Sequence, residues 1–184
     1  MFISKFFLFI FVCLFSVCAN SVSQTENTNQ TQTKEKPELS LKLERNGCNG
    51  GCPKYDLTIE PNGEIIFEGK SWTKVKGKAE DKLTEEQLNQ LIAEIEKANF
   101  FSLDNAYNYD SKNCPEIYTD SPGVNLTIKL KGIEKRINHY HGCNEKDSVT
   151  QKDWTERIYP QQLYKLENKI DEIVETKRWV GEEK

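Results

Sequence analysis

The stretch YDLTIEPNGEIIF, residues 55–67, decides the fold because it contains two short alternating runs separated by turn residues. Alternation of apolar and polar side chains is typical of a strand with one buried face. A loop at residues 61–63 sets the apolar side chains opposite one another, whereas a two-residue loop mixes the two faces. Proline and glycine suit the first and last positions of such a bulged loop. The sequence therefore predicts a hairpin with two apolar pairs, Ile59 with Ile65 and Leu57 with Phe67.

A second hairpin is predicted further along the chain. Residues 124–130 alternate in the same way, and the Lys-Gly pair that follows can turn the chain into residues 133–141. Residues 39–43 form another alternating strand, and residues 72–79 are expected to include a further short strand. The register that keeps one face of the second hairpin apolar has three pairs, Leu130 with Ile133, Leu126 with Ile137 and Val124 with His139.

Two amphipathic helices are predicted, one between the hairpins and one after them. The first covers residues 84–98 and opens with a capping box, in which Thr84 and Gln87 satisfy each other's free backbone donors. The second covers residues 160–175 and begins at a proline. The predicted order is β-β-β-α-β-β-α, with strands joined by hairpins rather than by helical crossovers. This order indicates an α+β fold with both helices packed on one face of an antiparallel sheet.

Residues 1–19 are expected to be a secretory signal peptide. Their apolar run is shorter than the ~20 residues that cross a bilayer, but it fits the core of a signal sequence. Residues 20–38 are polar and are expected to form a disordered linker, which leaves a single domain at residues 39–181. Cleavage after Ala19 and lipidation of Cys18 both stay open. The chain is therefore expected to be exported, as a periplasmic protein, a secreted protein or a membrane-anchored lipoprotein.

The charge pattern bears on the class of partner. The chain has a formal net charge of −4 at pH 7, and its lysines and glutamates are interspersed. Contact with nucleic acid requires clustered lysine and arginine, and the sequence shows no basic stripe. We therefore expect an unknown protein or envelope component as the partner, and no nucleic acid. Membrane attachment is expected only through an N-terminal lipid.

Cysteine usage predicts two disulfides. Of six cysteines, four lie outside the signal region, and an even set of thiols in an oxidising compartment most often forms disulfides. The glycines between the first two permit a sharp local turn of the backbone. The register of the second hairpin brings the other two to the same end of that hairpin. The predicted pairs are Cys48 with Cys52 and Cys114 with Cys143.

A metal site is the alternative use of the cysteines. His139 and His141 lie two residues apart on a predicted strand and point the same way, so that with Cys48 and Cys52 they form a Cys₂His₂ set. Their spacing is not that of a zinc finger, and export disfavours free thiolates, so we expect no metal and no cofactor. The sequence contains neither a G-x-S-x-G elbow nor an H-E-x-x-H motif, and no catalytic residue is predicted.

Several short motifs between residues 39 and 180 carry a family resemblance. They are Cys48-x-Gly50-x-Cys52-Pro53-x-Tyr55, Phe100-Phe101-x-Leu103, Thr119-Asp120-x-Pro122, His139-Tyr140-x-Gly142, Leu166-Glu167 with Ile170-Asp171, and Arg178-Trp179. On these motifs the chain resembles an uncharacterised family of exported bacterial proteins, a domain of unknown function. The resemblance implies an α+β domain in secreted or lipid-anchored proteins and brings no established activity. The segments around Cys114 and Cys143 depart from it, which suggests that the second disulfide is a local addition.

Taken together, these features favour an exported, non-catalytic binding or structural module stapled by disulfides. A metal-binding or metal-dependent protein that uses a Cys/His cluster is the alternative hypothesis. Any recognition surface is expected where the loop of the first cysteine pair approaches the second hairpin. Its candidate residues are Thr119, Asp120, His139, Tyr140 and His141.

Overall fold

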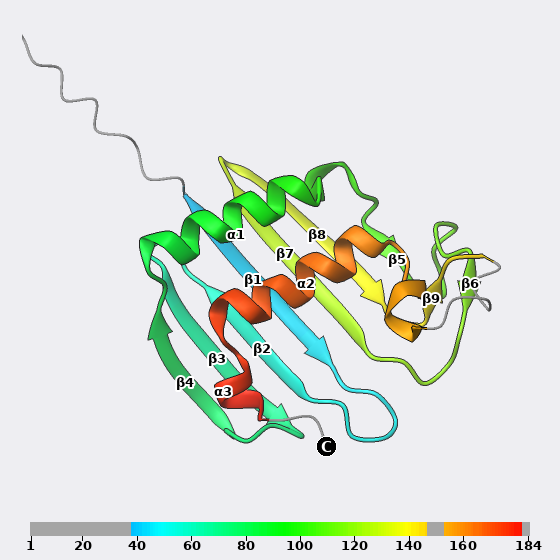
Figure 1. The fold of residues 1–184 in the computed structure, drawn as a ribbon, viewed down its shortest axis with the longest axis horizontal. Helices are drawn as coiled ribbons and strands as arrows, with labels where there is room; N and C mark the ends of the chain where they lie inside the picture. The colour runs from blue at the N-terminus through cyan, green and yellow to red at the C-terminus, as the bar shows by residue number, and fades with distance from the viewer. Residues whose placement is uncertain (1–37, 147–152, 182–184) are drawn as a thin grey trace, which may run out of the picture. The chain divides into compact units, whose positions relative to one another are not determined.

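A computed structural model describes residues 38–146 and 153–181 of the protein (Figure 1). The expected signal peptide, nearly all of the expected linker and the lipidation candidate Cys18 lie outside these residues. The larger sheet contains β1 (Leu39–Asn46), β2 (Lys54–Ile59), β3 (Glu64–Ser71), β4 (Gly77–Lys82), β5 (Ala106–Tyr107), β7 (Gly123–Leu130) and β8 (Ile133–Tyr140). A two-stranded sheet contains β6 (Glu116–Ile117) and β9 (Cys143–Asn144), and the α-helices are α1 (Glu85–Lys97), α2 (Gln161–Val174) and α3 (Lys177–Val180).

The larger sheet has seven strands in the order β4-β3-β2-β1-β7-β8-β5. Its central strand, β1, pairs antiparallel with β2 on one side and β7 on the other, and so joins the two predicted hairpins. Both hairpin registers are confirmed. The observed pairs include Ile59 with Ile65, Leu57 with Phe67, Leu126 with Ile137 and Val124 with His139.

The predicted order of elements omitted the strands β6 and β9 and the helix α3, and it differs from the structure in two further respects. First, four strands rather than three precede α1: the short strand expected within residues 72–79, which the predicted order did not count, lies at Gly77–Lys82 as β4 and is almost wholly exposed at the sheet edge. Second, the sheet is mixed rather than purely antiparallel, because the two-residue strand β5 pairs parallel with β8. The α+β class itself is correct.

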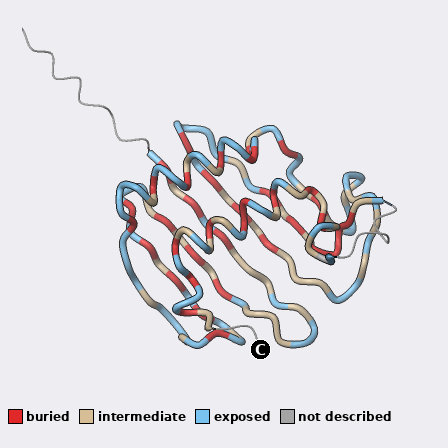
Figure 2. Tube along the Cα trace, in the orientation of Figure 1, coloured by how far each residue is buried: buried red, intermediate tan, exposed pale blue. Residues whose placement is uncertain are grey.

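The hydrophobic core lies between the sheet and the helices. Alternate residues of β1, β2, β3 and β7 are buried, as Figure 2 shows, while their neighbours on the other face remain partly accessible to water. Figure 1 shows α1 and α2 side by side across the same face of the sheet. The predicted capping box at Thr84 is present, with the Gln87 N–H donating to the Thr84 hydroxyl at 3.1 Å. None of the described helices is both long and apolar enough to span a membrane.

The short helix α3 ties the end of the domain to the sheet. The Trp179 ring packs against Phe67 with 5.2 Å between ring centroids. The backbone N–H groups of Lys74 and Val75 donate to the carbonyls of Val180 and Trp179 at 2.9 and 2.8 Å. The segment between β3 and β4 is therefore held in place by α3.

Gly142 provides a test of packing at the end of β8. A Cβ there would collide with the Tyr118 carbonyl and the Tyr140 ring, and the Gly142 carbonyl already accepts the Tyr118 N–H at 2.8 Å. We expect Gly142→Ala to lower the free energy of unfolding by about 1–3 kcal/mol, the usual cost of overpacking. Urea denaturation measures the change. Gly123→Ala is the matched control, because the nearest atom to a Cβ there lies 3.6 Å away; equal losses in the two variants would contradict the packing account.

Candidate functional site

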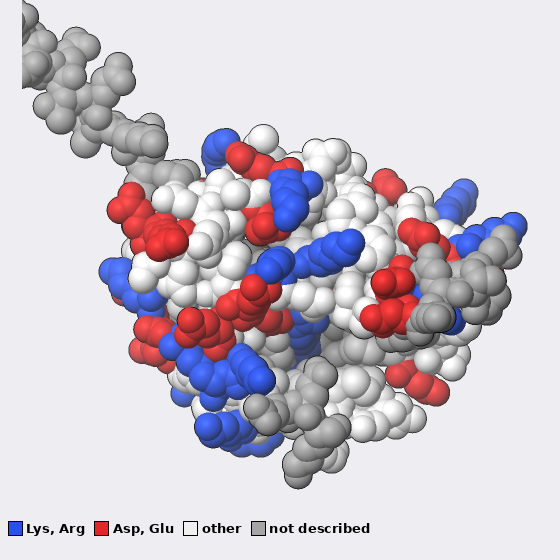
Figure 3. Space-filling view, viewed as in Figure 1, with Lys and Arg blue, Asp and Glu red and all other residues white. Residues whose placement is uncertain are grey.

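A cleft of about 1340 Å³ opens where β1 ends and β2 and β7 begin. The carboxyl-terminal part of α2 and helix α3 form one wall, and the segment after the Cys48–Cys52 loop forms another. Basic and acidic side chains are interspersed over the helix face of the molecule, with no broad patch of one sign (Figure 3). The polar and aromatic residues that line the cleft include Arg45, Tyr55, Lys74, His141, Tyr164 and Asp171.

Two histidines reach this region from the end of β8. His139 faces the helix layer in step with Ile137, because side chains two apart on a strand share a face. His141 follows the strand, and its backbone N–H donates to the Pro122 carbonyl at 2.9 Å. Both are buried, and His141 also lines the cleft.

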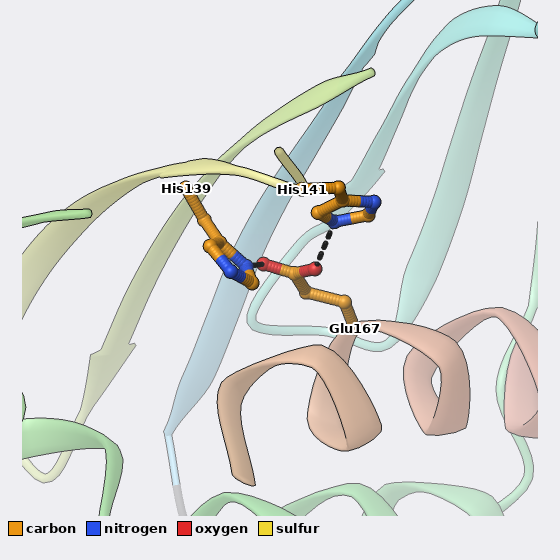
Figure 4. A group of neighbouring side chains, drawn as sticks. All are labelled: His139, His141 and Glu167. Atoms are coloured by element: carbon orange, nitrogen blue, oxygen red, sulfur yellow. Dashed lines mark hydrogen bonds and ion pairs between the residues drawn. The ribbon is translucent and has the colours of Figure 1, made fainter. Parts of the chain in front are cut away.

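Glu167 lies between the two imidazoles (Figure 4). Its position on α2 belongs to the buried stripe of that helix, so its carboxylate is turned into the core. One carboxylate oxygen lies 2.8 Å from Nδ1 of His139, and the other lies 2.8 Å from Nε2 of His141. Glu167 and His139 have no exposed surface. The cluster therefore links the helix layer to the sheet through a fully desolvated carboxylate.

The hydrogen-bond partners in this cluster show which ring nitrogens carry a proton. His139 Nε2 lies 3.1 Å from the Tyr159 carbonyl, which can only accept, so that nitrogen carries a proton. Burial by itself raises the pKa of Glu167, but the neighbouring imidazoles outweigh burial and hold its pKa below the usual range. Burial lowers the pKa of His141, which keeps that ring neutral. Neutral His141 donates from Nε2, which leaves Nδ1 as an acceptor directed away from the carboxylate (Figure 4).

A second polar network forms the floor of the cleft beside the first. Asp171, one turn beyond Glu167 on α2, accepts from Nε of Arg45 at 2.7 Å and from the Tyr55 hydroxyl at 2.6 Å. The Thr176 hydroxyl also donates to Asp171, at 2.8 Å. These contacts join β1, β2 and the end of α2 through one carboxylate.

The charges of this second network are fixed by their neighbours. Burial acts to lower the pKa of Arg45, but the charge and hydrogen bond of Asp171, together with the charges of Tyr55 and Glu167, outweigh it and leave the pKa raised. Burial, followed by the Asp171 charge, raises the pKa of Tyr55. Arg45 therefore stays cationic and Tyr55 stays a hydrogen-bond donor at any physiological pH. The arrangement suits a rigid binding wall rather than proton transfer.

The two disulfides have the predicted pairing, Cys48 with Cys52 and Cys114 with Cys143. Cys52 lines the cleft, so the first disulfide fixes one of its walls. Gly51 of this loop has a φ of 106°, and a Cβ there would lie 3.6 Å from the exposed ring of Trp72.

The Cys48–Cys52 disulfide argues against the alternative metal site made of Cys48, Cys52, His139 and His141. A sulfur atom held in a disulfide is no thiolate and cannot act as a metal ligand of that kind. The partner of the two histidines is Glu167 instead.

The candidate surface is divided between two faces of the sheet. His139 and His141 face the helices, whereas the Tyr140 hydroxyl donates to the Tyr118 carbonyl and accepts from the Ser121 N–H. Thr119 and Asp120 are exposed on the loop beside Tyr140 and do not line the cleft. The structure therefore does not unite these five residues in one surface.

Sequence reasoning assigned no role to Arg45, Glu167 or Asp171. The available signal was a pair of acids, Glu167 and Asp171, along the apolar stripe of the second predicted helix. A carboxylate on such a stripe is costly to bury without a partner, so it indicates a buried polar network. Arg45 carried no such signal, because it follows the alternating part of its strand.

The fold and the bonded cysteines define a disulfide-stapled α+β domain. The chain belongs to the family described as Domain of unknown function (DUF6438), whose model matches residues 39–174. No curated protein matches the chain.

The buried neutral state of His141 predicts a dependence of stability on pH. Because its folded pKa lies below the unfolded value of ~6.5, its contribution is complete above that value and falls as the pH drops. The stability advantage of wild type over His141→Gln, which can still donate to Glu167, is expected to shrink by at most about 1.4 kcal/mol per pH unit below that value. Urea denaturation of both proteins between pH 8 and pH 5 measures it. If the stability advantage of wild type over His141→Gln grew on acidification, the assignment of a neutral buried His141 would be contradicted.

Proposed function

We propose that the chain is an exported, non-catalytic binding module whose ligand or partner occupies the cleft beside the Cys48–Cys52 loop. The cleft itself carries the proposal. Its volume of about 1340 Å³ exceeds the roughly 300–1,000 Å³ typical of small-molecule pockets, so it has room for a peptide segment or a sizeable polar ligand. A mixed lining of aromatic and charged groups suits such a ligand.

The walls of the cleft are pre-organised. Asp171 joins two strands to α2, and Glu167 joins the same helix to β8. The disulfide at Cys48 and Cys52 closes the loop on the opposite side. A site held in this way loses little conformational entropy when it binds, which favours affinity.

The polar groups of the cleft support binding rather than catalysis. Among the described lining residues, the Cys52 sulfur is in a disulfide and is no free nucleophile. The Thr176 hydroxyl donates to Asp171. Arg45 and Tyr55 are both held by Asp171. With Thr176, three groups of the chain itself therefore donate to this carboxylate, and the described lining offers side chains that can orient a ligand.

Export is part of the proposal and is supported by the two disulfides, since such bonds persist in oxidising compartments. The partner is then an envelope component or an extracellular protein. A lipid on Cys18 would keep the domain at a membrane surface, whereas cleavage after Ala19 would release it.

Site-specific photo-crosslinking in cells that export the protein tests this function. A photoreactive amino acid replaces Lys74, an exposed residue that lines the cleft. The matched control replaces Lys129, which is exposed on the strand face away from the helices. We expect a discrete adduct from position 74 and none from position 129. The absence of an adduct at position 74, or the same adduct from both positions, would exclude the cleft as the binding site.

A further inference from the structure

We propose that His139, His141 and Glu167 form a binding site for one divalent transition-metal ion of the Zn²⁺ class. Each offers one ligand atom, and these atoms lie within 4.8 Å of one another. The proposal concerns the cluster alone, and it holds or fails independently of what occupies the cleft.

The donor set selects the class of ion. The two imidazole nitrogens suit Zn²⁺ and related first-row ions, which also accept a carboxylate oxygen, whereas Mg²⁺ and Ca²⁺ prefer oxygen ligands alone. Two histidines and a glutamate also form a known three-ligand zinc set that leaves one position open to water or a ligand. The four cysteines in the described residues contribute nothing, because all are in disulfides.

The surroundings of His139 match those of a metal ligand. Its Nε2–H faces the Tyr159 carbonyl at 3.1 Å, which fixes the ring so that Nδ1 points at the centre of the cluster. Metal-binding histidines usually donate their other ring N–H to a carbonyl or carboxylate in this way. A histidine buried only for packing does not need a ring nitrogen directed at the ligand atoms of two other residues, here His141 and Glu167.

A bound ion would take the place of the protons in this cluster. With no ion bound, each of the two 2.8 Å contacts of the Glu167 carboxylate is bridged by the proton of an imidazole N–H. A divalent ion takes the place of these protons. His139 releases its Nδ1 proton to solvent, His141 moves its proton from Nε2 to Nδ1, and both rings then coordinate in their neutral form.

His141 gives the ion its route of entry. His139 and Glu167 have no exposed surface, but His141 retains 4% of its surface and lines the cleft. The Tyr164 ring stands edge-on to it at 5.1 Å between centroids. An ion that passes these two rings reaches the cluster directly.

Calorimetric titration of the protein with ZnCl₂ tests the proposal, with tag-free chain that has been treated with EDTA and desalted. We expect one Zn²⁺ per chain. Glu167→Gln and His139→Gln should each weaken binding by more than the roughly 10–100-fold that loss of an outer partner causes. Glu96→Gln, at an exposed glutamate of α1 that does not line the cleft, is the matched control and should leave the affinity unchanged.

The site is overturned if the wild-type protein takes up no Zn²⁺, or if either variant binds as tightly as wild type. If the variants fail to fold, crystals of the wild-type protein soaked in Zn²⁺ decide the matter. An anomalous peak at the zinc edge between His139 Nδ1, His141 Nε2 and Glu167 supports the site. A peak elsewhere, or none, refutes it.

Discussion

Replacement of Glu167 with alanine is expected to lower the free energy of unfolding by about 3–5 kcal/mol, the range seen when one partner of a buried ion pair is removed. The carboxylate contacts His139 and His141 at 2.8 Å each, in the interior of the domain. Without it, the two imidazoles, whose ring centroids lie 4.9 Å apart, face a cavity with no acceptor. Urea denaturation followed by tryptophan fluorescence, in the presence of EDTA, measures the loss.

The matched control lies on the same helix. The Glu172 side chain is exposed and pairs with the Lys169 ammonium at the surface, so Glu172→Ala should cost at most about 1 kcal/mol. Glu167→Gln keeps one acceptor and should fall between the two. A loss for Glu167→Ala no larger than that for Glu172→Ala would show that the buried cluster contributes nothing to stability.

Removal of the Cys114–Cys143 disulfide, as the double alanine variant, is expected to have the second large effect. The bonded residues are 29 apart in sequence. In the chain-entropy model a loop of that length stabilises the folded state by roughly 3–4 kcal/mol. Cys143 also contributes a fully buried side chain to the core, which adds to the loss. Denaturant unfolding of the oxidised wild type and the variant gives the difference.

The first disulfide provides the comparison. Cys48 and Cys52 are only 4 apart, and the same model gives roughly 2 kcal/mol for so short a loop. Their double alanine variant should therefore be the more stable of the two, and its main defect should be a looser cleft wall. If the Cys48/Cys52 variant proves the less stable of the two, loop length does not determine how much each disulfide stabilises the fold.

The sequence predicted the parts of the fold that depend on local patterns. The loop at residues 61–63 could be chosen because a one-residue change in register moves every side chain to the opposite face. The pairing of Leu126 with Ile137 followed from the same rule. Thr84 and Gln87 identified the start of α1 through hydrogen bonds made within one turn.

Elements without such a pattern were missed or misplaced. The strand β4 is polar along nearly its whole length, because it lies at the sheet edge and buries almost nothing. The strand β5 has two residues, too few to show any period, and its parallel pairing depends on where the chain goes after α1.

The site was the least predictable part, because its partners come from distant segments. Arg45 and Asp171 are 126 residues apart, and His139 and Glu167 are 28 apart. Periodicity places each residue on a face but does not say which residue of another element lies opposite. The histidines could be assigned to one face, yet their partner depended on how α2 crosses the sheet.

The tie between α3 and the sheet also determines how far this domain can be trimmed. The family match ends at residue 174 and so leaves out Trp179, whose ring packs against Phe67. A chain shortened to that limit would expose this aromatic contact to water and free the backbone at Lys74 and Val75. Recombinant versions intended for crystallisation or ligand screening should therefore extend at least to Gly181.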